Sequence, residues 1–242
     1  MVANGFTFGG KSTWDFSIMK VEKYPSTKGA ARRYQTYVIP GRNGALHVDE
    51  GAFPNIPQSY ECYYHGDKPT NEEAHAVRAW LLGTPGYQRL TDVYDTSHYR
   101  LAMVTGELDI ENKLNRYGRF TVNFDCDPRA FLLSGENPVT FPGSGTINNP
   151  TAYDAQPLIL VTGTGAGTVS VNGTTVEIES LSGTLYLDCE NENAYALSAG
   201  TPVNRNSTIY APSFPVLSPG NNGVQFTGGI TSLQIIPRWW EL

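Results

Sequence analysis

The chain has 242 residues, of which 40% are hydrophobic and 17% charged, and its formal net charge is −6. This length suggests one or two domains, and a charged fraction below the usual quarter or so, with 25 Gly and 16 Pro, is typical of a turn-rich β protein. A net negative chain lacks the basic surface that nucleic-acid binders usually carry, so specific nucleic-acid binding is not expected.

The sequence also argues against a membrane or secreted protein. No apolar run approaches the roughly 20 residues of a membrane-spanning helix, and the N-terminus lacks a basic region followed by an apolar core. Each of the cysteines, Cys62, Cys126 and Cys189, lies in an apolar strand pattern, and an odd number cannot all pair within one chain. We therefore expect synthesis in the cytosol and buried free thiols, without disulfides or a metal site.

The first 65 residues predict strands separated by polar turns. Phe6 to Ile18 alternates apolar with small or polar side chains and predicts a half-buried strand. Lys20 to Arg33 is rich in Lys, Arg, Pro, Ser and Gly, which favours a solvated loop; a partner-binding arm is the alternative. Further strands are expected at 34–39, 46–48 and 59–65.

A tight turn is expected at Pro40 to Gly44, which reads Pro-Gly-Arg-Asn-Gly. Gly41 and Gly44 suit positions that need a positive φ, and Asn43-Gly44 is a tight-turn signal. These residues are interpreted first as structural. Arg42, between them, could also donate an ion pair at an interface.

Residues 71–82 predict a single helix in the first half. Thr70 can cap its first turn, and Glu73, three residues later, can complete a capping box. The apolar residues at helical spacing are Ala74, Val77, Trp80 and Leu81. Gly83 is expected to end the helix in a left-handed conformation, before Pro85. One short helix cannot be its own core, so a sheet must cover its apolar stripe.

More strands are expected after the helix, at 99–105, 107–110 and 119–126. The composition then becomes rich in Gly, Pro and Asn between Ser134 and Thr151, where we place a domain boundary, giving domains 1–135 and 136–242. Beyond it no helix is expected. A hairpin around Asn172-Gly173 and several short strands predict a β-sandwich or jelly roll.

No catalytic or metal-binding pattern stands out. The histidines are in neither a metalloprotease motif nor zinc spacing; they are His47, His65, His75 and His98. Acidic residues that could in principle form a glycosidase pair are Asp92, Asp95, Glu107, Asp109 and Glu111, but such residues are common on turns and strand ends. Asp188, Glu190 and Glu192 lack the glycine and loop spacing of a calcium site. We expect a structural or binding protein with no catalytic residues, cofactor or metal.

Several segments together resemble a known family. In order they are FTFGGKSTWDFSI, VIPGRNGAL, the helix ending WLLG, YQRLTDVYD, FTVNFDCDP, LDCEN, FPVLSPGNNGV and IIPRWWEL. Together they resemble the distal tail (Dit) proteins of siphophages, over nearly the whole chain. No one of these segments would be specific alone.

The resemblance implies a mainly β fold of two domains. The N-terminal domain would be a tail-tube-like β-sandwich with one helix that closes into a hexameric ring. The C-terminal domain would be a galectin-like β-sandwich (jelly roll). The last strand and residues 237–242, with Trp239 and Trp240 adjacent, could pack back on the first domain or on a neighbouring subunit.

The implied function is that of a virion structural protein, the hub of the tail tip or baseplate, assembled in the host cytoplasm. Its implied partners are further copies of itself in one ring or two stacked rings, the major tail tube protein, the tail-associated fibre or spike protein, and receptor-binding proteins. No membrane association is implied. Candidate residues for the ring or tube interface are Lys28, Arg32, Arg33 and Arg42, with the turn residues Gly41, Asn43 and Gly44 in a structural role.

The alternative function is a carbohydrate-binding module for host-surface recognition. Sugar-binding galectins use a His-x-Asn-x-Arg strand with a stacking Trp. Here Asn204-Arg205-Asn206 has no preceding His in register. A wall-degrading enzyme is a third hypothesis, with Glu107 and Asp109 as its carboxylates.

Overall fold

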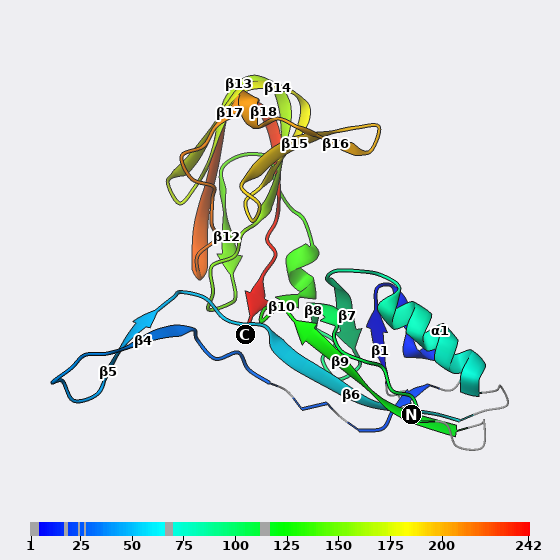
Figure 1. Ribbon diagram of the computed structural model, residues 1–242. Coiled ribbons are helices and arrows are strands. Elements are labelled where there is room, and N and C mark those ends of the chain that lie inside the picture. The colour runs from blue at the N-terminus through cyan, green and yellow to red at the C-terminus, as the bar shows by residue number, and fades with distance from the viewer. Residues whose placement is uncertain (1–4, 17–18, 24, 27, 66–69, 112–116) are drawn as a thin grey trace. The chain divides into compact units, whose positions relative to one another are not determined.

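The computed structural model describes residues 5–16, 19–23, 25–26, 28–65, 70–111 and 117–242. The chain forms two compact units, residues 1–130 with Leu242 and residues 131–241, and each has its own hydrophobic core (Figure 1). The fold is mainly β with one α-helix in the described first half, as expected. The division at 135/136 and the separate roles expected for the two halves remain predictions.

The main sheet of the first unit is antiparallel (Figure 1). Its strands follow the order β2-β1-β7-β8-β9-β6-β3, with the bounds β1 Phe6–Phe8, β2 Lys11–Ser12, β3 Lys20–Val21, β6 Ile56–His65, β7 Gln88–Asp92, β8 His98–Val104 and β9 Tyr117–Cys126. In β9, Phe120, Val122 and Phe124 are buried while Thr121 and Asn123 between them are exposed. The period of two gives the sheet one apolar face and one polar face.

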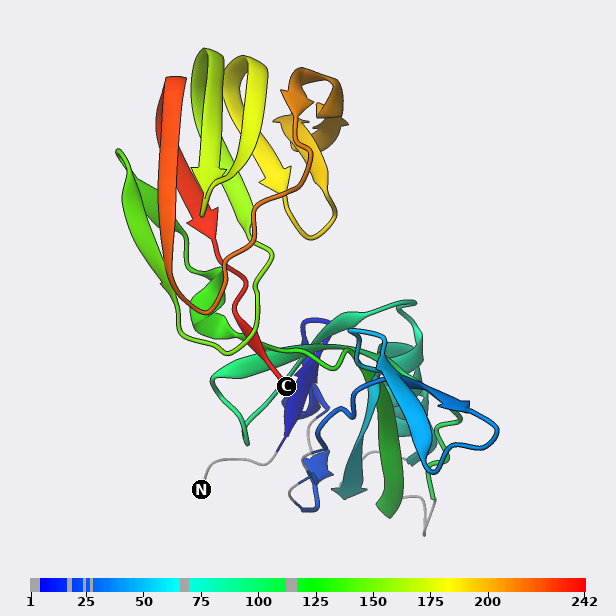
Figure 2. The ribbon, with the colours of Figure 1, turned by 90° about the vertical axis from the view of Figure 1, so that its left-hand side faces the viewer.

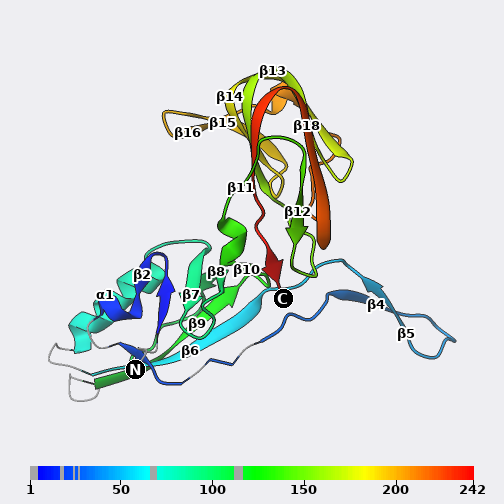
Figure 3. The same ribbon diagram turned by 180° about the vertical axis from the view of Figure 1, so that it is seen from behind.

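Helix α1 (Thr70–Leu82) lies beside this sheet (Figure 3), and its buried residues share one hydrophobic core with those of the sheet. The predicted stripe is buried, and Trp80 is its anchor. The Trp80 indole nitrogen donates to the Phe8 carbonyl at 2.9 Å, and the indole ring stacks on Phe6 and Phe16. The capping role of the Thr70 side chain lies outside what the structure describes.

Gly83 ends the helix for a different reason from the one expected. Its φ is not in the left-handed region. Instead, a Cβ at Gly83 would lie 2.2 Å from the carbonyl oxygen of Ala79. The glycine is therefore needed because the last turn of the helix approaches it too closely for any side chain.

Two predicted strands are wrong in this unit. The strand at 6–18 is broken after Phe8, because Gly9 and Gly10 turn the chain with φ of 56° and 80°. At 107–110 there is no strand, although Leu108 and Ile110 are buried. Alternation there reflects burial of every second side chain, without strand pairing to any residue that the structure describes.

The second unit is an all-β fold dominated by three long strands (Figure 2). The order is β11-β18-β13-β14-β15-β16, with β12 also on β18 and β17 also on β14. The bounds are β11 Val139–Phe141, β12 Gly145–Asn149, β13 Leu158–Val171, β14 Thr174–Asp188, β15 Asn193–Ser198, β16 Thr201–Asn204, β17 Ile209–Tyr210 and β18 Gly220–Ile236. Strands β10 (Ala130–Leu132) and β19 (Trp240–Glu241) pair with each other and are not part of this sheet. Edge strand β16 contains Pro202 opposite Leu197 of β15.

The predicted hairpin at Asn172-Gly173 is the tip of a much longer ladder. Both residues have positive φ, 51° and 86°, as a two-residue hairpin turn requires. β13 and β14 pair from there back to Leu158 and Asp188. Glycine permits the close crossing of β13 and β18, because a Cβ on Gly229 would lie 1.8 Å from the Thr164 carbonyl oxygen. The ladders shift register in this glycine-rich region, which bends the sheet.

All three cysteines are buried and free, as expected, and burial raises the pKa of each thiol to about 12. Near the C-terminus, both adjacent tryptophans contact the second unit. Trp239 lies in its core, and Trp240 stacks on Tyr153 with ring centroids 4.5 Å apart.

We predict that Trp80→Phe lowers the free energy of unfolding by about 1–3 kcal/mol, because the Phe8 carbonyl loses its buried donor. Urea unfolding followed by far-UV circular dichroism measures this. Trp14→Phe is the control, since Trp14 is 45% exposed and should change stability by less than about 0.5 kcal/mol. Equal effects of the two variants would contradict the anchoring role of Trp80.

A second prediction concerns Asp188, whose carboxylate accepts from Arg238 at 2.7 Å and from Asn191 at 2.8 Å. Burial raises the pKa of Asp188, but these hydrogen bonds outweigh it and hold the pKa below its ordinary value. The resulting stability is present above the unfolded carboxyl pKa near 4 and is lost as pH falls through the lower folded pKa.

Asp188→Asn should therefore cost about 2 kcal/mol at neutral pH and flatten the loss of stability below about pH 4. Denaturant unfolding at a series of pH values tests this, with the exposed Glu192→Gln as control. An unchanged acid limb in Asp188→Asn would refute it.

Candidate interaction surface

The most exposed element of the first unit is a two-stranded hairpin, β4 (Tyr34–Val38) and β5 (Ala45–Asp49). Its register runs from Tyr34 opposite Asp49 to Val38 opposite Ala45. Among the strands that the structure describes, β4 and β5 pair only with each other, so no third strand extends the hairpin (Figures 1 and 3). Both outer edges of the hairpin therefore present strand backbone groups without a strand neighbour.

Glycine sets the geometry of the hairpin tip. Gly41 and Gly44 both have φ of 80°, and a Cβ at either would meet no atom within 4 Å. Glycine is therefore needed at these two positions for the positive φ of the backbone and not because space is lacking for a side chain. Arg42 lies between them, donates its backbone N–H to the Ile39 carbonyl, and makes no ion pair with another described residue.

Arg32 and Arg33 form ion pairs within the chain, at the base of the hairpin. Arg32 contacts Asp49 at 2.9 Å and lies over the Phe53 ring, and Arg33 contacts Glu50 at 3.0 Å. These exposed pairs are worth at most about 1 kcal/mol each. The two ion pairs stiffen the base of the hairpin. Arg42, at the tip, has no described carboxylate to compensate its charge.

Lys28, the fourth candidate, lies apart from Arg32, Arg33 and Arg42. It lines a cavity of about 240 Å³ together with Asp92 of β7, His98 of β8 and Asp95 in the turn between these strands. The expected arm from Lys20 to Arg33 therefore begins in the sheet at β3 and ends at the hairpin base.

Apolar side chains cover both faces of the hairpin. Six of the thirteen large exposed hydrophobics in the described chain fall within residues 34–48; they are Tyr34, Tyr37, Val38, Ile39, Leu46 and Val48. Val38 is 82% exposed. An isolated two-stranded hairpin is marginally stable, and clustered exposed apolar groups mark interaction sites. This hairpin is the strongest candidate interaction surface of the chain.

The alternation at 34–39 and 46–48 predicted strands correctly but gave no sign that both faces would be exposed. An alternating pattern does not tell whether the apolar face of a strand is buried by the same chain or by another chain. The useful signal was apolar residues at consecutive positions, Tyr37 to Ile39, which place apolar groups on both faces.

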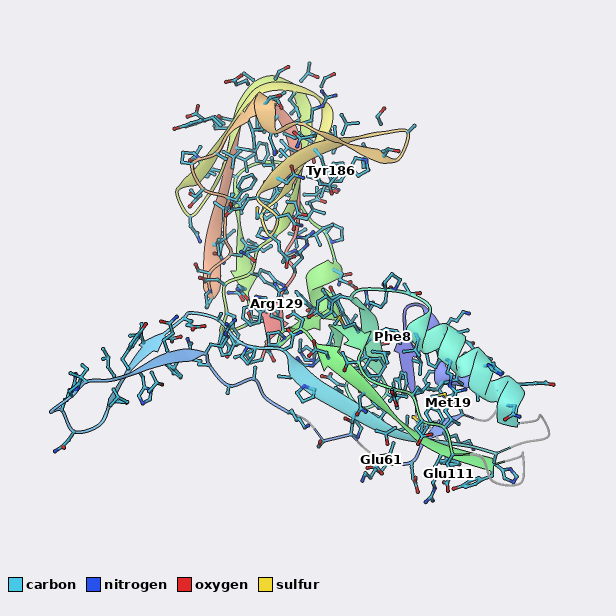
Figure 4. All side chains as sticks on the ribbon, viewed as in Figure 1. Phe8, Met19, Glu61, Glu111, Arg129 and Tyr186 are labelled. Carbon is cyan, nitrogen blue, oxygen red and sulfur yellow. The ribbon has the colours of Figure 1, made fainter. Side chains whose placement is uncertain are left out.

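The candidate carboxylates separate into two places. Glu107 and Asp109 lie in a groove of about 490 Å³ with Glu22 and Glu61 on the exposed side of β6 and β9. Figure 4 shows Glu61 on this outer side, away from the core residue Phe8. Arg119 pairs with Glu22 at 2.9 Å and Lys23 with Glu61 at 2.7 Å.

Asp92 and Asp95 line the other cavity, where both already accept hydrogen bonds. Asp92 accepts from the Tyr60 hydroxyl at 2.6 Å and from two backbone N–H groups. Burial raises the pKa of Asp95, but hydrogen bonds from His98 and Ser97 outweigh it and the pKa falls. A carboxyl held ionised in this way is unsuited to act as a general acid at neutral pH.

Within the described ranges, no group of three or more His, Cys, Asp and Glu side chains is arranged to hold a metal ion. None of the described helices has the length and apolar character needed to cross a bilayer.

Comparison with known proteins identifies the fold. No protein-family model and no curated protein sequence matches the chain. Among solved structures, the chain has the fold of phage tail hub and baseplate proteins. It is similar to the Dit protein of phage SPP1, described as a hub of the adsorption apparatus in phages infecting Gram-positive bacteria. The TM-score is 0.73 at 14% identity, over 99% of both chains.

Two structures of the phage P2 baseplate in its activated conformation show the same likeness. The one with calcium gives a TM-score of 0.56 at 9% identity, over 97% of this chain and 98% of that one. The one with strontium gives 0.56 at 10% identity, over 96% and 97%. The fold expected from the sequence resemblance is confirmed.

We predict that Leu46→Ser combined with Val48→Ser changes the free energy of unfolding by less than about 0.5 kcal/mol, because both side chains are already exposed. Val122→Ala, in the buried face of β9, should cost about 2 kcal/mol. Urea unfolding at low protein concentration measures both. A large loss in the hairpin variant would mean that the free chain covers its own hairpin.

Proposed function

We propose that the chain is a Dit protein, a virion structural protein that forms a hexameric ring at the tail tip. The observation that carries this proposal is the fold likeness to a Dit hub protein over 99% of both chains. The ring would join the tail tube to a tail-associated fibre or spike protein, and could carry receptor-binding proteins. Its role would be structural and not catalytic, in a particle assembled in the host cytoplasm.

The exposed hairpin gives this proposal a physical contact. A closed ring needs a heterologous interface, in which one patch of a subunit meets a different patch of the next. The β4–β5 hairpin has unpaired edges and apolar faces, so it can insert against a neighbouring copy or the tail tube. Arg42 at its tip would meet an acidic partner surface, while Arg32 and Arg33 would hold the hairpin base.

The acidic groove has a proposed place in the same assembly. Four carboxylates against two paired cations leave the outer side of β6 and β9 negative. A negative surface would let DNA pass through a ring without adhering to it. This would be the channel side of the ring.

The test is the solution mass of the full chain, measured by light scattering coupled to size exclusion at several concentrations and salts. We expect six or twelve chain masses. Tyr37→Asp combined with Leu46→Asp should reduce the mass to that of a monomer, because charges would be buried at the contact. Deleting Ser26 to Ala31 should leave a folded monomer and weaken the ring.

Glu192→Gln serves as the matched surface control and should leave the mass unchanged. A wild-type chain that stays a monomer at every concentration counts against self-association of the isolated protein. Oligomers of unchanged mass in the hairpin variant would remove the hairpin from the interface.

A further inference from the structure

A small polar cavity lies in the second unit, beside the long strand β14. Its volume is about 160 Å³, and its lining is Ser180, Leu181, Ser182, Thr184, Leu185, Ala196, Arg205 and Thr208. Hydroxyl groups and one guanidinium supply the polar lining, over a floor that includes the buried Leu181 and Leu185. No carboxylate lines it.

The strand edge at this cavity is open. β14 pairs on its outer side with β17 at Glu177 and Ile178 and with β15 from Tyr186 to Asp188. Between those ladders, no described strand pairs with residues 179–185 on this outer side, whereas residues 181–185 pair with β13 on the other side. Alternate residues of an antiparallel strand direct their N–H and C=O groups to each side, so some of these groups face the cavity and need polar partners.

Arg205 is fixed in place at the opposite wall. Its backbone N–H donates to the Ala194 carbonyl at 2.7 Å, and its own carbonyl accepts from Thr208 N–H at 2.9 Å and Thr208 Oγ1 at 2.8 Å. No ion pair joins its guanidinium to another described residue. The main chain of Arg205 is therefore fixed, and its exposed guanidinium is available to an external anion.

The hydroxyl groups add donors around the same space. Thr184 shares a hydrogen bond with Thr162 at 3.1 Å. The hydroxyls of Ser180 and Ser182 have no hydrogen-bond partner among the described residues. A guanidinium with several hydroxyl donors suits an oxyanion with more than two oxygens.

We propose that this cavity binds the phosphate group of a small phosphorylated polyol. The cavity volume of about 160 Å³ is large enough to hold a phosphate group. The remaining hydroxyl and backbone oxygens would accept from the hydroxyl groups of the polyol. This role of Arg205 differs from that of the arginine in the His-x-Asn-x-Arg strand of sugar-binding galectins. The site does not depend on ring formation.

The test is equilibrium dialysis of the full chain with radiolabelled glycerol 3-phosphate at constant ionic strength. We expect saturable binding of one molecule per chain with a Kd of about 1 mM or lower. Inorganic phosphate should bind more weakly, and acetate and glycerol should not compete. Arg205→Gln should weaken binding at least tenfold, and Ser182→Ala a few fold.

Lys11→Gln is the matched control, because it also removes one exposed positive charge but lies in β2 of the other unit. It should leave binding unchanged. Absence of saturable binding, an Arg205→Gln variant that binds as well as wild type, or equal competition by acetate would each overturn the proposal. Circular dichroism of each variant establishes that the fold is retained.

Discussion

The ladder between β6 and β9 determines most of the first unit. It pairs every residue from Ile56 to His65 with one from Cys126 to Tyr117. Because side chains alternate across a strand, this register decides which residues enter the core and which form the acidic outer side. Tyr60 and Cys62 face inward with Phe124, while Glu61 faces outward. A slip of one residue would exchange the two faces.

Local chemistry explains what the sequence could predict. The helix, the tight turn at Gly41 and Gly44, and the strand at β9 each depend on residues close together in the chain. The failures concern distant groups. Gly83 is required by the Ala79 carbonyl, and the long β13–β14 ladder could not be expected from a short apolar run at Leu158 to Val161.

The candidate surface shows the same limit. Nothing local distinguishes an apolar hairpin covered by its own chain from one left exposed, so the exposure of Val38 and Leu46 emerged only from the fold. Likewise, Lys28, Arg32, Arg33 and Arg42 look equivalent as cations in sequence. The carboxylates of Asp49 and Glu50, brought opposite them by the hairpin register, separate Arg32 and Arg33 from Arg42.

The edge strand β16 has a consequence for self-association of the chain through its sheet. A proline tolerated in a paired strand has its missing N–H on the side away from its partner. Pro202, opposite Leu197, therefore removes a donor from the free border of the sheet. That border is a poor template for a further strand. A high local concentration of the chain would therefore not extend the sheet through this border.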